Sequence, residues 1–456
     1  MPDELKAIET RMRRTAELCL QAAQKAGARQ AAVKISRSRF TEAGFRDGDL
    51  DKAISSAKQR LTLRLFIKGR YGVHFTNDLR PQALEKFIND AADLTRLLEP
   101  DPWRSLPGPG RYPQPPGPDL EIFDPALAKT QPEHWLDLGR NMESLAREEG
   151  AGKGAKLISS YGGAYAEVSQ GLLANSDGFA GVQAETGAFA GCSVVLLDSN
   201  NQAKRRSGWC WEGGRDLAGL RDKARLQDIA HKAGARAWGQ MGAKPGPTGR
   251  AAVLVENRAA GKLVGQLLRA LSGRALHLKR SYLSGKQGQK VASPLLTLQD
   301  RPLLKGGLAS AWFDGEGMAR QTLSLIEAGN LSNYYLDTYY AKALGLPPTT
   351  GSSSNVVLPA SGSQKLDELE AAMDRGLVAT SFLGGNFNST TGDFSYGVRG
   401  RWVEGGKKAF AVEGMNLAGN AADLWGSLAA VGADPYLISA VRAPSLLFSE
   451  VQLSGA

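Results

Sequence analysis

The histidines, serines and glycines of the chain form none of the common catalytic spacings. The four histidines are His74, His134, His231 and His277, and none is followed by glutamate, so the HExxH helix of zinc proteases is absent. GxSxG, GxxxxGK[ST] and GxGxxG motifs are also missing, which removes the usual support for hydrolase, NTPase and dinucleotide-binding functions. A serine nucleophile within 352–354, paired with a distant histidine, stays open, although such Gly-Ser runs are more often flexible loops.

The segment with the strongest binding character is Gly384–Gly397, which is rich in glycine and short polar residues between more apolar flanks. Glycine lets a backbone approach a ligand closely, and free N–H and C=O groups can accept a peptide as an added strand. We expect peptide contacts at these positions: Gly384, Gly385, Asn386, Asn388, Gly392 and Asp393. The alternative is a pair of tight turns within a sheet, and composition alone does not decide between the two.

The composition is that of a globular protein. Of 456 residues, 42% are apolar, 22% are charged and 54 are glycines without a three-residue period, which excludes disorder and collagen-like fibres and favours turn-rich sheets. The three cysteines form no CxxC pair and fit a reducing cytoplasm. The net charge of +10 is spread without a long basic block, which disfavours nucleic acid as a partner. With neither a signal-peptide core nor a bilayer-length apolar run, we expect a cytoplasmic location and no membrane contact.

Proline and glycine clusters divide the chain into segments. We expect an N-terminal α/β domain over 1–100, a proline-rich linker over 101–120, a middle α+β domain over 121–242 and a β-rich C-terminal domain over 243–456. Helical spacing of apolar residues marks five longer segments: 4–28, 81–98, 132–149, 216–241 and 258–272. A shorter helix is expected over 366–375, and the Asn-x-Asp-Gly run at 175–178 predicts a hairpin turn. The predicted fold class is α+β, with mainly antiparallel sheets and flanking helices.

Six segments of the second half are shared, in order, with one protein family. They are Ala243–Gly249, Phe313–Gly317, Ile326–Gly329, Tyr335–Tyr339, Gly384–Gly397 and Val412–Asn420. At these separations the chain resembles the TldD/PmbA family, and most closely its TldE (PmbA) branch. The resemblance implies a TldD/PmbA-like fold and a role in a heterodimeric zinc protease.

The same resemblance locates a degenerate metal site. In the TldD branch an HExxxH helix and a cysteine near the C-terminus hold zinc. The matching positions here are Gly265, Gln266 and Ala270, and the segment around 439–441 has no cysteine. Without imidazole, thiolate or carboxylate there, no tetrahedral zinc site can form and no metal-bound water can be activated. We therefore expect no catalytic residue, metal or cofactor in this chain, with zinc in a TldD-like partner.

The resemblance implies a non-catalytic subunit of a metallopeptidase that pairs with a TldD-like protein and presents unfolded or precursor peptides for cleavage. Two alternatives stay open. One is a stand-alone, homodimeric peptide-binding module without proteolysis, and the other is a nucleic-acid-associated regulator. The sequence does not choose between a housekeeping role and the processing of ribosomally made peptide precursors.

Overall fold

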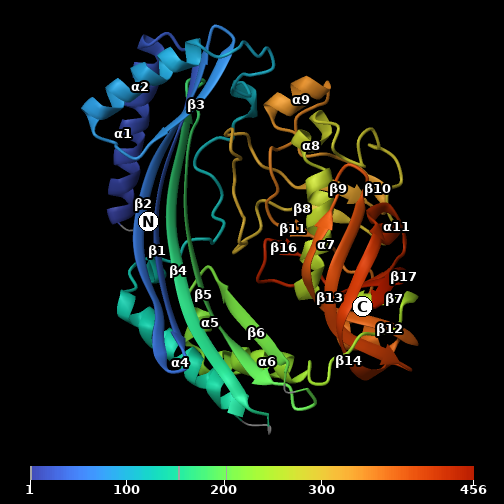
Figure 1. The fold of residues 1–456 in the computed structure, drawn as a ribbon. Coiled ribbons are helices and arrows are strands. Elements are labelled where there is room, and N and C mark those ends of the chain that lie inside the picture. The colour runs from blue at the N-terminus through green and yellow to red at the C-terminus, as the bar shows by residue number, and fades with distance from the viewer. Residues whose placement is uncertain (1–2, 152–154, 202, 456) are drawn as a thin grey trace.

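The N-terminal half of the protein, seen here in a computed structural model, is built on one long, curved antiparallel sheet (Figure 1). The structure describes residues 3–151, 155–201 and 203–455. Six strands pair in the order β3-β2-β1-β4-β5-β6. Their bounds are β1 Gln30–Arg46, β2 Asp49–Ile67, β3 Arg70–Thr76, β4 Leu157–Asn175, β5 Ala180–Leu197 and β6 Arg205–Gly214.

This sheet is continuous across the proline-rich segment. Strand β1 pairs with β4 from Ala32–Asn175 to Arg46–Tyr161, so segments 1–100 and 121–242 contribute neighbouring strands to one sheet. The segment 101–120 contains one short 3₁₀ turn, Pro109–Arg111, and buries Leu106 and Leu120. Its prolines lack backbone donors, so the segment lies over the sheet without joining the strand ladder. The expected linker is therefore not a break between two separate sheets.

Helices cover one face of the first sheet. They are α1 Asp3–Lys25, α2 Pro81–Arg96, α3 Pro125–Ala128, α4 Pro132–Ala151, α5 Ala218–Arg221 and α6 Lys223–Trp238. The α1–α2 pair and the α4–α6 pair form two apolar clusters, and β4 supplies both from alternate residues: Leu172 and Ala174 to the first, Ala164 and Ala166 to the second. Alternate residues of a strand share a face, so both helix pairs lie on the same side. The opposite side is turned toward the C-terminal half (Figure 1).

The C-terminal half contains a nearly closed sheet with the order β14-β13-β12-β7-β17-β15. Its strands are β7 Gly249–Val255, β12 Arg375–Phe387, β13 Asp393–Glu404, β14 Lys407–Asn420, β15 Leu428–Val431 and β17 Leu446–Gly455. Strand β14 also pairs with β17, which closes five of these strands into a ring. All neighbours are antiparallel except β7 and β12, which run parallel. The expected helix at 366–375 is shorter in the structure, because residue 375 already begins β12.

A second, small sheet and short helices complete this half. The small sheet has the order β10-β9-β8-β11-β16, with β8 Leu298–Asp300, β9 Leu323–Glu327, β10 Asn330–Leu331, β11 Val356–Val357 and β16 Val441–Arg442. The helices are α7 Asn257–Ala270, α8 Gly273–His277, α9 Thr338–Leu344, α10 Leu366–Ala371 and α11 Ala421–Gly426. Antiparallel-rich sheets with flanking helices confirm the predicted α+β class. None of the helices in the described ranges combines the length and apolar character that crossing a membrane would need.

A buried arginine joins the two halves. Arg206 on β6 is only 2% exposed; its Nε lies 2.6 Å from Asp198 Oδ2, and its guanidinium also pairs with Glu413 on β14. Burial alone would raise the pKa of Asp198, but hydrogen bonds from the Asn200 N–H and from Arg206 outweigh it and lower that pKa. Both carboxylates are therefore held ionised around one cation.

We predict that Arg206→Met destabilises the protein by about 3–5 kcal/mol, because Asp198 would stay buried without its cation. Urea unfolding at neutral pH measures the change. The matched control is Arg205→Met, since Arg205 is the exposed neighbour on the same strand and its loss should cost no more than about 0.5 kcal/mol. Equal unfolding midpoints for the two variants would contradict a bridging role for Arg206.

A second contact between the halves contains a half-buried carboxyl group. Glu316 accepts a hydrogen bond from the Thr338 N–H at 2.8 Å, and Arg64 of β2 donates to the neighbouring carbonyl of Gly315 at 2.7 Å. Burial raises the pKa of Glu316 to about 7, and the nearby carboxylates of Asp337 and Asp314 add to that rise. The native protein therefore keeps a proton on Glu316 at pH values where the unfolded chain has lost it.

This raised pKa predicts a loss of stability on the alkaline side. Between pH 4.5 and about 7 the native state binds more protons than the unfolded state, so the unfolding free energy falls as pH rises, by up to about 3 kcal/mol. Glu316→Gln should remove this slope and unfold at higher urea than the wild type at pH 8. The control Glu327→Gln, at an exposed position of β9, should keep the wild-type slope. Parallel pH profiles for wild type and Glu316→Gln would refute the assignment.

Candidate functional site

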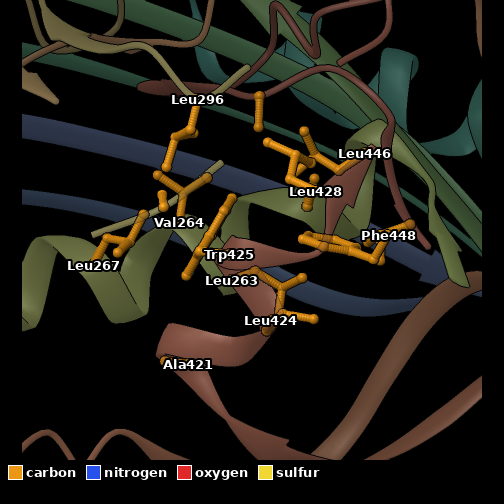
Figure 2. Packing of buried hydrophobic residues seen from close by; sticks show 14 of the residues in the cluster. Leu263, Val264, Leu267, Leu296, Ala421, Leu424, Trp425, Leu428, Leu446 and Phe448 are labelled. Carbon is orange, nitrogen blue, oxygen red and sulfur yellow. The ribbon is translucent and has the colours of Figure 1, made fainter. Parts of the chain in front are cut away.

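Helix α7 holds all three positions of the degenerate metal site. Apolar residues recur along it every three to four positions, and Leu263, Val264 and Leu267 point into the core beside Trp425 (Figure 2). The helix begins directly after β7, which ends at Val255. The core packing therefore fixes the other side of α7, which faces the β12–β13 hairpin, in one orientation.

The degenerate positions do not fit a zinc ion. Gly265 and Ala270 have no side-chain donor atom, and Ala270 is fully buried. The amide of Gln266, also fully buried, donates from Nε2 to the Tyr396 hydroxyl at 2.9 Å, while its Oε1 has no hydrogen-bond partner among the described residues. The cysteine-free segment at 439–441 does lie against this helix, since Val441 Cγ1 is 3.9 Å from where a Cβ on Gly261 would stand.

The remaining potential ligands are scattered. The four histidines lie on β3, α4, α6 and α8, and the three cysteines are buried. Within the described parts of the chain, no three His, Cys, Asp or Glu side chains gather in a way that could hold a metal ion. Ser354 donates to Asp300 from its hydroxyl and its N–H, so this serine is fixed by a carboxylate and not by a histidine.

The glycine-rich stretch forms the end of β12, a turn and the start of β13. Asn388, Gly392 and Asp393 serve the turn: the Gly392 N–H donates to the Asn388 carbonyl, and the Asn388 N–H donates to that of Asp393. Gly392 has a φ of +88° and is buried. The second part of the stretch is therefore a tight turn within the sheet, as the alternative interpretation predicted.

The first part of the stretch is a bulge in an exposed strand. Gly384, Gly385 and Asn386 are exposed, and the pairing of β12 with β13 shifts register between Leu383 and Asn386. Gly385 has a φ of +97°, and a Cβ there would stand 2.3 Å from the Ser395 carbonyl oxygen. Only glycine fits this position, so the bulge is specified by the sequence.

Helix α7 supports this bulged hairpin through three side chains. Lys262 Nζ donates to the Gly384 carbonyl at 3.1 Å and lies 4.6 Å from the centre of the Tyr396 ring. Gln266 bonds the hydroxyl of the same tyrosine, and the Arg269 guanidinium lies over Phe387. The two regions singled out in the sequence, the degenerate helix and the glycine-rich stretch, are therefore one structural unit.

Next to this unit, β12 has an unpaired edge. Its parallel pairing with β7 covers only Gly376–Ala379, and the last hydrogen bond on that side runs from the Glu256 N–H to the Ala379 carbonyl. Beyond that bond no strand of the described chain pairs with this side of β12, although the strand continues to Phe387. Backbone groups at such an edge can pair with an added strand.

The unpaired edge opens into a cleft of about 760 Å³ between the two halves of the molecule. One wall consists of 380–383 of β12, 399–401 of β13 and Arg258 and Lys262 of α7. The other wall comes from the N-terminal half, with residues 207–209 of β6 and the end of α6. Arg236 of α6 pairs with Glu256 at the start of α7, so an ion pair connects the two walls.

No sequence pattern indicated the second wall. Trp209, whose side chain is 54% exposed, stands opposite α7, and the Arg258 guanidinium lies 4.6 Å from its ring centre. Trp209 and Arg258 come from different halves of the chain, and neither belongs to a motif. The tertiary packing of the two halves brings them together, with the Arg236–Glu256 ion pair close by.

Three family models match successive parts of the chain. They are described as PmbA/TldA metallopeptidase domain 1, central domain and C-terminal domain, and they match residues 31–95, 125–238 and 248–455. Together they cover most of the chain, including both walls of the cleft.

Similar proteins agree with these matches. "Metalloprotease PmbA" of Escherichia coli O157:H7 is 26% identical over 93% of this chain and 92% of its own length. A crystal structure from Bacteroides thetaiotaomicron VPI-5482, of a candidate modulator of DNA gyrase, superposes with a TM-score of 0.91 at 34% identity, covering 97% of this chain and 99% of that one. TldE from Thermococcus kodakarensis shares the fold, with a TM-score of 0.83, 23% identity and coverage of 97% and 100%. The chain therefore belongs to the PmbA/TldD family of metalloprotease-like proteins.

Proposed function

We propose that this chain is a TldE-like, non-catalytic subunit that pairs with a TldD-like zinc metalloprotease and presents unfolded or precursor peptides to it. The absence of donor atoms at Gly265 and Ala270 supports a role without metal in this chain. The contribution that remains for this chain is to bind the peptide and to form part of the cavity in which the partner cleaves it. Zinc, and the water it activates, would belong to the partner.

The main support for peptide binding is the unpaired edge of β12 at 380–383, inside a cleft of about 760 Å³. An extended peptide added here would pair its backbone with the strand whatever its sequence, which suits a subunit that receives unfolded chains. The bulge at Gly384–Gly385 ends the regular edge and bends the strand, so it would limit how far a bound peptide stays in register.

Division of labour between two subunits predicts a simple reconstitution result. The purified chain alone should hold far less than one equivalent of zinc by metal analysis and should not cleave an unfolded test protein such as reduced, alkylated lactalbumin. Adding a TldD-like protein should produce cleavage that chelation of zinc abolishes. Stoichiometric zinc in this chain, or cleavage without a partner, would contradict the proposal. Stable self-association that persists with the partner present would favour the homodimeric alternative.

Blocking the edge should weaken peptide binding. Cys19, Cys192 and Cys210 are buried, so an introduced surface cysteine can be modified selectively. Ser381→Cys carrying a bulky maleimide should weaken binding of a labelled extended peptide at least about tenfold, because the adduct occupies the strand edge.

The matched control for this experiment is Ser395→Cys with the same adduct. Ser395 is exposed on the same hairpin, but its strand is paired on both sides, with β12 and β14. Its adduct should leave peptide affinity nearly unchanged. Equal losses for the two adducts, measured by fluorescence anisotropy, would argue against the β12 edge as the binding surface.

A further inference from the structure

The cleft beside the β12 edge is strongly cationic. Of the residues that the structure describes, seven lysines and arginines line it, against two carboxylates, Glu256 and Asp367. Several of the cations are neutralised by partners: Arg236 pairs with Glu256, Arg399 with Glu413, and Arg401 with Glu370. An excess of positive charge remains after these pairs are set aside.

Three cations of the cleft have no carboxylate within ion-pairing distance among the described residues. Arg258, Lys262 and Lys408 donate to backbone carbonyls only, those of Trp209, Gly384 and Gly239. A carbonyl dipole compensates a full charge only in part, so each of these cations can still gain from an anionic partner. In addition, Arg399 Nε is buried without a hydrogen-bond partner in the described chain.

The spacing of two of these cations matches that of an added strand. Arg258 and Lys262 stand four residues apart on α7, so their Cβ atoms are about 5–6 Å apart on one side of the helix. Alternate side chains of an extended strand lie about 6.6 Å apart on one face. A peptide on the β12 edge with acidic residues at alternate positions can thus place one carboxylate near each cation.

We propose that the cleft selects acidic peptides: an extended segment pairs with the edge of β12 at 380–383 and places alternate carboxylates against Arg258 and Lys262, with Lys408 adding to the field. This inference rests on the proposed function, since it names the class of peptide that the same edge receives. The selection comes from charge, while the backbone pairing stays independent of sequence.

Peptide fits this surface better than nucleic acid does. Single-stranded nucleic acid is held by several aromatic rings on which successive bases stack. Among the described residues that line the cleft, only Trp209 offers a largely exposed ring, and Arg258 already lies over it. The strand edge, in contrast, offers backbone donors and acceptors that pair with another peptide chain.

The test uses three labelled ten-residue peptides in which threonine alternates with glutamate, glutamine or lysine. Fluorescence anisotropy with the full chain should show the glutamate peptide binding about tenfold tighter than the glutamine peptide, with the lysine peptide weakest. High salt should reduce the difference between them, because the charges are partly exposed. Equal affinities for the glutamate and glutamine peptides would overturn the inference but leave the proposed function in place.

The first variant combines Arg258→Gln and Lys262→Gln in one protein. The second is Lys408→Gln, and its matched control is Lys407→Gln. Lys407 is the exposed neighbour of Lys408 and does not line the cleft. The double variant should bring the ratio of the affinity for the glutamate peptide to that for the glutamine peptide close to unity. Lys408→Gln should lower this ratio about twofold, and Lys407→Gln should leave it unchanged. The ratio is the readout because a distorted hairpin weakens both peptides equally, whereas loss of charge weakens only the acidic one.

Two results separate failure of the inference from failure of the proposed function. A ratio unchanged in the double variant would overturn charge selection by α7. If the Ser381→Cys adduct does not affect peptide binding, the β12 edge is not the binding surface, and the proposed function fails as well. A competition experiment with a twenty-nucleotide oligo-dT strand tests nucleic acid as the ligand. If this strand displaces the labelled glutamate peptide at a lower concentration than unlabelled glutamate peptide does, the cleft binds nucleic acid and the inference is overturned.

Discussion

The cleft depends on a mismatch in length between two parallel strands. Strand β7 ends at Val255, where the chain turns into α7, while β12 continues past Ala379 to Phe387. Backbone groups that would pair inside a full sheet therefore face a cavity. Because unpaired buried backbone groups are costly, such an edge is stable only where water or another chain satisfies it. The space next to β12 thus follows from where β7 stops, and the side chains of α7 line it.

Ion pairs connect the second wall to the C-terminal half. Arg206 reaches from β6 to Glu413, and Arg236 reaches from α6 to Glu256 at the start of α7. Glu413 also accepts from Arg399 of β13, so one carboxylate on β14 connects the N-terminal half to the strand that lines the cleft. Hydrogen-bonded ion pairs fix direction as well as distance, which an apolar contact does not. Such pairs link the two walls of the cleft.

Local features of the fold could be predicted from the sequence, since each depends on neighbouring residues. The helix expected at 258–272 is α7, and the turn at 175–178 forms as expected, with Asn175 accepting from the Asp177 N–H and Gly178 at a φ of +94°. Pairing of β1 with β4 could not be predicted, because it joins strands separated by helices and the proline-rich segment, and no local pattern encodes such a partner. For the same reason the sequence identified α7 and the glycine-rich stretch but not the wall that faces them.

The degenerate helix keeps a structural task that does not need metal ligands. Its apolar side is buried in the C-terminal core (Figure 2). Its polar side supports the β12–β13 hairpin through Lys262, Gln266 and Arg269. At the position matched to a catalytic glutamate, an amide can donate to the Tyr396 hydroxyl without bringing a charge into a fully buried site, whereas an unpaired carboxylate there would be costly. Glutamine at 266 therefore suits support of the hairpin. A helix without metal ligands can in this way remain necessary, because the bulged β12–β13 hairpin depends on its side chains.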